Sequence, residues 1–333
     1  MTIQDVARHF TEVSADRPEA FDEMASVVYA FQQANNRVLA RYCTSINVDT
    51  AYAYLPVAAF KYAPVTSFPF EEAEHVFESS GTGRGVTSKH YVCDLAVYER
   101  AVTTHFEQVF GPGPFTLVAH LPHYAERGAT SSLLYMVALL IRRYGDDHSG
   151  FVLDDRMALE KAVKHSISEH TSFLLFGAAF GLLDLVEEDA VTLPSQARVI
   201  ETGGMKTYRR EISREVLHRQ LAEGFGLAES QIWSEYGMCE LMSQCYTRGE
   251  SIFYPPPWMR FRVVDPEQPD RAVREGESGA LAFFDLANLY SVSAILTEDR
   301  AVRRRKGFEV LGRLSQAELR GCNFLLESEQ QAR

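Results

Sequence analysis

The sequence has few cysteines, no apolar run long enough to span a membrane and no excess of positive charge. Its five cysteines are an odd number without a pairing pattern, which favours a reduced, cytoplasmic protein over a disulfide scaffold. The longest apolar segments, 133–141 and 173–183, are shorter than the roughly 20 residues of a transmembrane helix. The N-terminus does not resemble a signal peptide. A net charge of −12 disfavours a surface for nucleic acid or anionic lipid.

The chain has enough apolar residues to form a sizeable hydrophobic core. It is 46% hydrophobic over 333 residues, which suggests about two domains. Residues 1–70 are predicted to form an N-terminal helical segment and a connector. Residues 71–258 alternate between strand-like and helix-like segments, which predicts an α/β layered core with a largely parallel sheet. Residues 259–313 are predicted to form a β-rich lobe, and residues 314–333 a short tail.

Individual helices and strands can be predicted for particular segments. Apolar residues at helical spacing, such as Phe21, Met24 and Phe31, predict helices before residue 41. A proline-containing connector is expected over 56–69. Helices are predicted over 131–144 and 213–225, the second ended by Gly226. Strands are predicted over 115–121, 171–177, 197–204 and 231–237, and in the lobe over 259–265, 279–286 and 308–313.

A loop rich in glycine and small hydroxyl residues is a candidate for phosphate binding. Glycines let backbone N–H groups approach phosphate oxygens, and small hydroxyls add donors without bulk. The loop lacks the lysine-containing Walker A pattern, and its glycine spacing does not fit a dinucleotide fingerprint. A flexible turn is the alternative. The residues of this candidate phosphate loop are Ser79, Ser80, Gly81, Thr82 and Gly83.

Five further motifs follow at intervals, and each is ambiguous by itself. ETGGMK (201–206) follows a predicted strand and fits a strand-end turn. SEYGMCELMS (234–243) fits a core tyrosine followed by a solvent-exposed glutamate. DLANLYSVSAILTEDRA (285–301) contains Asp299, which fits an acid in a turn, and FEVLGR (308–313) contains Arg313, which fits a surface arginine. The last motif is ELRGCNF (318–324).

In this order and spacing, over about residues 76–324, the motifs resemble the core motifs of the adenylate-forming enzymes. ELRGCNF narrows the resemblance to the acyl-protein synthetases of the bioluminescence fatty-acid reductase type. The resemblance implies the α/β body of an adenylate-forming N-terminal domain, with a β-rich lobe and a truncated C-terminal segment. It also implies ATP-dependent activation of a carboxylic acid as acyl-AMP, with Mg²⁺ as cofactor, followed by transfer to a thiol.

The resemblance assigns the nucleotide-binding residues one by one. Gly203 and Gly204 would lie against the adenine, because a side chain there would block the base, and Met205 is assigned to the nucleotide with them. Tyr236, followed by Gly237, would stack on the adenine, and Glu240 would bind Mg²⁺. In the family a threonine hydrogen-bonds the α-phosphate, and Cys239 stands at that position, with a thiol that is a weaker donor. Asp299 and Arg313 would contact the ribose hydroxyls.

The remaining assignments concern catalysis and the acid. Lys89 matches the lysine that follows the phosphate loop, and Lys206 is a second candidate for phosphate contact. Cys322 would accept the acyl group as a thioester, since thiolates are strong nucleophiles near neutral pH, and the alternative is a bystander thiol. His120, Phe176 and Gly177 are assigned to an apolar pocket for a fatty or aryl acid. The expected acceptor is a thiol on a partner such as an acyl reductase or a carrier protein.

One departure leaves alternatives open. Adenylate-forming enzymes at large continue past the hinge arginine with a mobile lobe ending in a catalytic lysine, whereas the last lysine here is Lys306. Either Lys89, Lys206 or a basic residue of 300–306 substitutes for it, or the adenylation half-reaction is slow. The alternatives are a ligase that acylates coenzyme A or a carrier protein, with Cys322 incidental, and a non-catalytic nucleotide-binding subunit.

Overall fold

The computed structural model describes residues 1–14, 16–46, 51–79, 86–122, 130–153, 155–188, 191–203 and 212–315. Its contacts divide the chain into two compact units, each assembled from separate stretches of sequence. The β-sheet unit contains residues 1–102, 238–243 and the chain from 254 onward. The α/β unit contains residues 103–237 and 244–253. The segment boundaries expected from the sequence remain a prediction.

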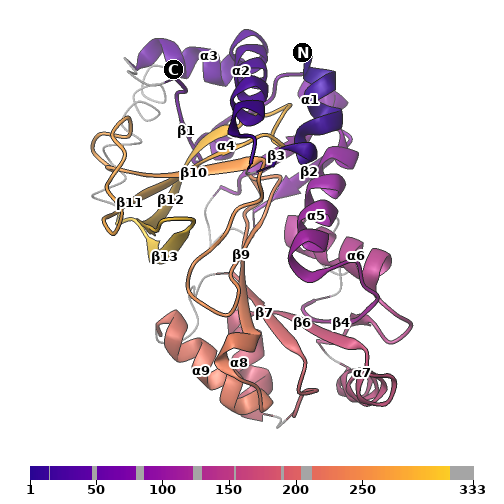
Figure 1. The fold of residues 1–333 in the computed structure, drawn as a ribbon. Coiled ribbons are helices and arrows are strands. Elements are labelled where there is room, and N and C mark those ends of the chain that lie inside the picture. Colours follow the sequence, from indigo (N-terminus) through magenta and orange to yellow (C-terminus); the bar gives the residue numbers. More distant parts are fainter. Residues whose placement is uncertain are drawn as a thin grey trace. The chain divides into compact units, whose positions relative to one another are not determined.

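The α/β unit is built on a sheet with the strand order β5-β4-β6-β7-β8-β9 (Figure 1). All neighbouring strands pair in parallel except β8 and β9. Both β4 and β6 are buried along nearly their whole length, which is the reason for their near-continuous apolar sequences. The strands are β4 (Phe115–His120), β5 (Gly150–Phe151), β6 (Ser172–Ala178), β7 (Arg198–Thr202), β8 (Ile232–Tyr236) and β9 (Cys245–Tyr246).

Capped helices pack against this sheet. Side chains of Ser131, Asp155 and Ser213 each accept a hydrogen bond from a backbone N–H in the first turn of the helix that follows. Gly226 ends the last helix at φ 70°, a left-handed conformation that favours glycine. The helices are α6 (Ser132–Tyr144), α7 (Arg156–Glu169), α8 (Ala179–Glu188) and α9 (Arg214–Phe225), and a 3₁₀ turn, η3 (Glu229–Gln231), precedes β8.

The β-sheet unit contains a sheet in the order β1-β12-β11-β10, with β13 also paired to β12. β1 pairs in parallel with the start of β12, and β13 pairs antiparallel with its end, so both lie along one edge of this long strand. A separate hairpin joins β2 to β3. The strands are β1 (Leu55–Pro56), β2 (His75–Glu78), β3 (Lys89–Val92), β10 (Met259–Val264), β11 (Ser278–Asp285), β12 (Ala294–Arg303) and β13 (Phe308–Arg313).

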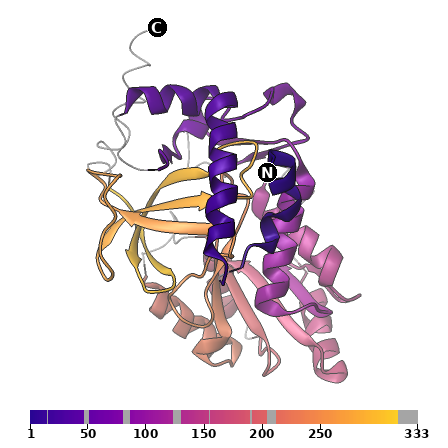
Figure 2. The same cartoon turned by 45° about the horizontal axis from the view of Figure 1, so that its top comes forward.

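A long N-terminal helix lies across this sheet. In Figure 2 the indigo helix α2 (Pro18–Asn35) crosses the orange and yellow strands. Phe21 packs edge-on against Phe284 of β11 at 5.8 Å between ring centroids. Gln32 is fully buried, and its Nε2 donates to the carbonyl of Asn288 at 2.8 Å. The remaining helices and 3₁₀ turns here are α1 (Ile3–His9), η1 (Phe10–Glu12), α3 (Arg37–Ser45), α4 (Ala59–Tyr62) and η2 (Phe70–Glu72), and α5 (Leu95–Phe110) continues into the α/β unit.

The elements expected from the sequence are found with small changes at their ends, and one segment differs. The expected connector over 56–69 contains the short helix α4, whose Phe60 is buried at 2% exposure. Proline content predicts extended chain there, but burial of an aromatic side chain stabilises a helical turn between the prolines. No helix in the described part of the chain is both long and apolar enough to cross a membrane.

Candidate nucleotide site

Two glycine turns leave neighbouring parallel strands at one edge of the α/β sheet. β7 ends at Thr202 and is followed by Gly203, while β8 ends at Tyr236 and is followed by Gly237. Thr202 and Glu235 are register partners, so the two strands end side by side. Ligands of open α/β sheets bind outside the carboxyl ends of the strands. Two motifs that are distant in sequence therefore form one candidate ligand edge.

Each glycine has a physical reason to be there. Gly203 has φ 84°, a conformation that strains any residue with a side chain, and a Cβ placed there would meet nothing within 4 Å. At Gly237 a Cβ would lie 2.5 Å from Oε1 of Glu235, so the missing side chain gives space to that carboxyl. The Tyr236 ring is half-buried and packs edge-on against Phe253 at 5.8 Å. The two turns therefore place exposed backbone and the Tyr236 ring together at the carboxyl ends of these strands.

Behind the turns lies a buried acidic pair, Glu201 on β7 and Glu235 on β8, with 3% and 6% exposure. Arg214 Nε and His218 Nε2 both lie 3.6 Å from Oε1 of Glu201. Thr202 donates a short hydrogen bond to Glu235. Burial, with a smaller contribution from Glu201, raises the pKa of Glu235 to about 7, against the Thr202 hydrogen bond. Near neutral pH this carboxyl is therefore poised between its charged and neutral forms.

The glycine- and hydroxyl-rich loop connects the two strands of the β2–β3 hairpin. Its base is closed by the Ser79 N–H, which donates to the Ser88 carbonyl at 3.0 Å, and by the Ser88 N–H, which donates to Ser79 Oγ at 3.0 Å. Lys89 is the register partner of Glu78, and its Nζ lies 3.1 Å from Glu78 Oε1. This hydrogen bond raises the pKa of Lys89. The lysine is thus charged and held at the base of the loop.

The Cys239–Glu240 segment is positioned by hydrogen bonds within the β-sheet unit. His90 Nδ1 lies 2.8 Å from the Cys239 carbonyl, and Asn288 Nδ2 donates to the Glu240 carbonyl at 2.8 Å. Burial first, and then the neighbouring Glu240, raise the pKa of the Cys239 thiol well above its usual value. Cys239 is therefore a neutral thiol at physiological pH, a weak donor and not a nucleophile.

A buried aspartate fixes the end of the same segment. Asp285 closes β11 and accepts hydrogen bonds from the Met242 N–H at 3.2 Å and from Ser243 Oγ at 2.8 Å. Burial raises the pKa of Asp285 to about 6, although these hydrogen bonds lower it. The Trp258 indole donates to Ser243 Oγ at 3.0 Å. Met242 and Ser243 are thus held by hydrogen bonds to Asp285, at the end of β11, and to Trp258.

Asp299 and Arg313 lie directly opposite each other on β12 and β13. Nε of Arg313 lies 3.4 Å from Oδ1 of Asp299, and its guanidinium also donates to Glu298 at 2.8 Å. Lys61 Nζ lies 3.6 Å from the other oxygen of Glu298. The ladder therefore brings together the two residues that the resemblance assigns to one sugar, and adds Glu298 as a partner of the arginine.

The residues expected to surround the acid lie in or against β4 and β6 of the α/β unit. Phe176 is fully buried in β6, and His120, which ends β4, is 9% exposed. A Cβ on Gly177 would lie 2.5 Å from the Leu182 side chain, and one on Gly181 would lie 3.5 Å from the His120 ring. Gly177 thus permits close packing of α8 on the sheet, and Gly181 lies beside His120. Their role towards an acid stays a prediction.

Several predicted site residues lie outside the described residues. They are Ser80, Gly81, Thr82, Gly83, Gly204, Met205, Lys206 and Cys322.

Sequence inspection missed the buried polar groups that support the motifs. Glu201 and Glu235 stand inside strands that begin with mostly apolar residues, and a charged residue in such a strand is a signal of a buried site. His218 and Arg214 gave no such signal, because helix α9 has polar residues on its exposed face as well. Asp285 and Asn288 could be found only once the chain was folded, since their partners come from a distant segment.

Comparison with solved structures defines the class of fold. An open conformation of 2-hydroxyisobutyryl-CoA ligase, in complex with 2-HIB-AMP and CoA, matches with a TM-score of 0.66 and 13% identity, over 92% of this chain and 77% of that chain. The same ligase in its postadenylation state with 2-HIB-AMP matches with a TM-score of 0.65 and 13% identity, over 91% and 69%. ATP-bound MatB from Rhodopseudomonas palustris matches with a TM-score of 0.52 and 16% identity, over 74% and 49%. The chain has the fold of the adenylate-forming enzymes, as the motif order predicts.

The family within that class is identified by sequence. The family described as acyl-protein synthetase, LuxE, matches residues 151–330, more than half of the chain. The matched region contains Tyr236, Asp299, Arg313 and Cys322. The chain belongs to the LuxE acyl-protein synthetase family, which confirms the resemblance inferred from the motifs. No curated protein matches the chain significantly.

Proposed function

We propose that this protein activates a carboxylic acid with ATP as acyl-AMP and then transfers the acyl group to a thiol. The observation that supports this most strongly is the glycine edge of the α/β sheet, where the turns at Gly203 and Gly237 follow neighbouring strands. Membership of an acyl-protein synthetase family points the same way, as does a fold shared with a CoA ligase that was crystallised with 2-HIB-AMP. A planar base fits against backbone without side chains, and Tyr236 offers an aromatic face to it.

In the proposed site the ribose is held by Asp299. Two acceptor oxygens on one carboxylate suit the vicinal diol of a ribose. Arg313, 3.4 Å from Asp299 and 2.8 Å from Glu298, fixes the orientation of that carboxylate and adds donors of its own. The β- and γ-phosphates would be bound by the loop that follows Ser79, and Lys89 at its base would neutralise part of their charge.

Glu240 is the proposed Mg²⁺ ligand. Its carboxylate is a hard oxygen donor of the kind that Mg²⁺ prefers, and its backbone is fixed by the hydrogen bond from Asn288. The ion would supply charge neutralisation on the triphosphate. Cys239 stands where the family has threonine, and because its thiol stays neutral it contributes at most a weak hydrogen bond to the α-phosphate.

The proposed reaction has two steps. A carboxylate oxygen of the acid attacks the α-phosphorus of ATP, the bond to pyrophosphate breaks, and acyl-AMP forms. A thiolate sulfur then attacks the acyl carbonyl carbon, and AMP leaves with the bonding electrons. The protein acts mainly by positioning the reactants and neutralising charge.

Cys322 is the proposed first acceptor, from which the acyl group passes to a partner protein such as an acyl reductase or a carrier protein. His120, Phe176 and Gly177 are proposed to line the pocket of a fatty or aryl acid, since β4 and β6 are apolar along their length. A cytoplasmic location, where thiols stay reduced, completes the proposal.

Radiolabelled acid tests the thiol step. The full chain is incubated with labelled fatty or aromatic acid, Mg²⁺ and ATP, and protein-bound label and acyl-AMP are measured separately. We expect Cys322→Ser to lose the protein-bound label while acyl-AMP still forms. Cys93→Ser, a matched control at a half-buried thiol, should keep both. Unchanged labelling of Cys322→Ser would contradict the role of Cys322.

Coenzyme A is the second candidate acceptor. It is favoured by the solved ligase of this fold that was crystallised with 2-HIB-AMP and CoA. Acyl-CoA formation at full rate by a Cys322→Ala variant would support coenzyme A over the protein thiol.

A further inference from the structure

A cluster of two histidines and an aspartate lies at the end of the α/β sheet opposite the glycine edge. Asp146 and His148 belong to the turn between α6 and β5, and His165 lies in the last turns of α7. Thr116, next to the cluster, is the second residue of β4. The cluster is therefore at the amino-terminal ends of parallel strands, whereas the nucleotide candidates Gly203 and Gly237 follow carboxyl ends. It has no place in the proposed reaction.

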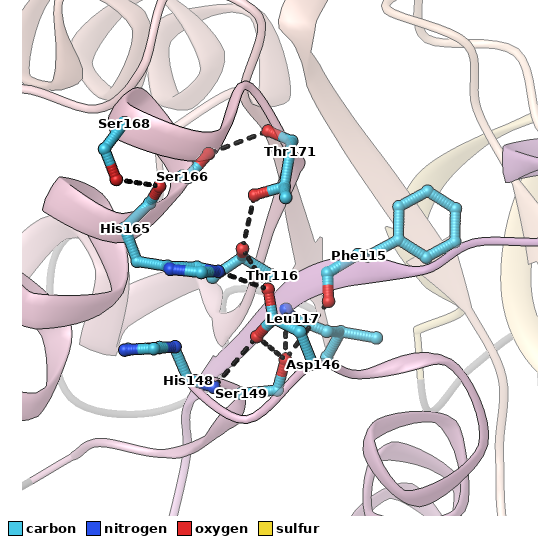
Figure 3. Close-up of polar contacts among 10 residues, drawn as sticks. All are labelled: Phe115, Thr116, Leu117, Asp146, His148, Ser149, His165, Ser166, Ser168 and Thr171. Carbon is cyan, nitrogen blue, oxygen red and sulfur yellow. Dashed lines mark hydrogen bonds and ion pairs between the residues drawn. The ribbon is translucent and has the colours of Figure 1, made fainter.

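The three side chains lie next to one another. His165 Nε2 lies 3.3 Å from Asp146 Oδ2, and the rings of His148 and His165 stack with their centroids 3.9 Å apart and 9° between their planes. Figure 3 shows both imidazoles on the same side of the Asp146 carboxylate, one above the other. One ligand atom from each residue lies within 4.8 Å of the other two.

The carboxylate is held in place by neighbouring groups. Thr116 Oγ1 donates to Asp146 Oδ2 at 2.6 Å, and Thr171 Oγ1 lies 2.7 Å from Thr116 Oγ1. The backbone N–H of His148 donates to Asp146 Oδ1 at 2.9 Å, and Ser149 Oγ lies 3.0 Å from the same oxygen. Such outer hydrogen bonds fix ligating carboxylates in metal sites and raise metal affinity by about 10–100-fold.

The chemistry of the donors selects the ion. Two imidazoles and one carboxylate suit Zn²⁺ and similar transition metals, whereas Mg²⁺ and Ca²⁺ prefer oxygen ligands alone. Zinc bonds of about 2.0–2.2 Å place tetrahedral ligand atoms about 3.3 Å apart. In the present stack the two ring planes are nearly parallel, so the imidazoles must turn for a nitrogen of each to point at one ion. The exposed position of His148 leaves its ring room to do so. Water from the solvent side would complete the coordination.

We propose that Asp146, His148 and His165 form a binding site for a divalent transition-metal ion of the zinc class. The ion would tie the α6–β5 turn to the C-terminal half of α7, across the start of β4. Because it binds the folded chain and not the unfolded one, Zn²⁺ would stabilise the protein in a concentration-dependent manner. The inference does not depend on the proposed acyl transfer.

The test is metal binding by the full chain after treatment with EDTA and dialysis. Zn²⁺ is titrated by calorimetry, and Co²⁺ is followed by visible absorption, where thiolate ligands give a charge-transfer band that imidazole and carboxylate ligands do not. His148→Gln and His165→Gln are compared with His9→Gln. His9 is a matched control, because it is an exposed histidine that also pairs with a carboxylate, at 2.8 Å from Glu12.

We expect one equivalent of Zn²⁺ to bind, at least tenfold more weakly in His148→Gln and His165→Gln and unchanged in His9→Gln. The melting temperature should rise with Zn²⁺ in the wild type and in His9→Gln, and much less in the other two variants. His148 is exposed, so its replacement leaves the fold intact and keeps the comparison interpretable. Absence of binding, or binding that is equal in all four proteins, would overturn the proposal.

Discussion

At the residue scale, the least expected group is the buried carboxyl of Glu235. Its pKa is raised to about 7 from an ordinary 4.5, mainly by burial. The folded protein therefore keeps this proton to a higher pH than the unfolded chain does. At low pH the carboxyl is protonated in both states and does not weaken folding. As pH rises from about 4.5 to about 7, the unfolded chain loses this proton first, so the free energy of unfolding falls.

Replacing Glu235 with glutamine should remove this pH dependence. Glutamine keeps the shape of the neutral carboxyl and can still accept the hydrogen bond from Thr202. In urea unfolding, the wild type should lose on the order of 2–3 kcal/mol relative to Glu235→Gln between about pH 5 and about pH 8. His90 and His105, whose pKa values burial lowers to about 4, change stability in the opposite direction but equally in both proteins. Parallel pH profiles would contradict the assignment.

The same carboxyl determines what residue 237 can be. A Cβ on Gly237 would lie 2.5 Å from Oε1 of Glu235, whose side chain is buried and hydrogen-bonded to Thr202, so Gly237→Ala should destabilise the protein by on the order of 1 kcal/mol. Gly150→Ala, also in the α/β unit, is the control, because a Cβ there would meet nothing within 4 Å. Its effect should stay within about 0.5 kcal/mol in the same unfolding experiment. An equal loss in both variants would show that the contact is not the cause.

At the element scale, the β12–β13 ladder aligns the residues proposed to bind ribose. Asp299 and Arg313 are register partners, and the arginine also bonds Glu298. Asparagine keeps the size of the aspartate side chain, which is only 15% exposed. Removing the charge of Asp299 in this way should therefore affect nucleotide binding more than folding.

Asp299→Asn should raise the KM for ATP in an adenylation assay by about tenfold, the loss expected for a hydrogen bond to a charged group. Glu309→Gln is the matched control on the same ladder, where Glu309 pairs with Arg304. It should leave the KM unchanged. An unchanged KM in Asp299→Asn would remove that residue from the nucleotide site.

The elements could be predicted from the sequence wherever local pattern agrees with burial. β4 and β6 were predicted from their continuous apolar runs, and the end of α9 was predicted from Gly226. Helix α4 was missed because two prolines dominate the local signal, while burial of Phe60 determines the outcome. The loop after Ser79 was predicted from its composition, but the hairpin that closes its base depends on pairing between two strands.

At the scale of the whole molecule, the family match begins at residue 151, before α7, and runs through parts of both units past β13. The order of motifs sufficed to predict the adenylate-forming fold, because each motif follows a strand or turn that the fold requires. Supporting residues such as Glu201, Glu235 and Asp285 were not predicted, since their partners are distant in sequence. The identity of the acid also depends on side chains from several separate strands and helices.

Acid-dependent exchange of pyrophosphate into ATP, measured across fatty and aromatic acids with the full chain, tests the central claim most directly. We predict exchange that requires Mg²⁺ and one class of acid, and that falls in Asp299→Asn but not in Glu309→Gln. Measurable ATP binding without exchange for any acid would contradict the claim and would indicate a nucleotide-binding subunit without adenylation activity.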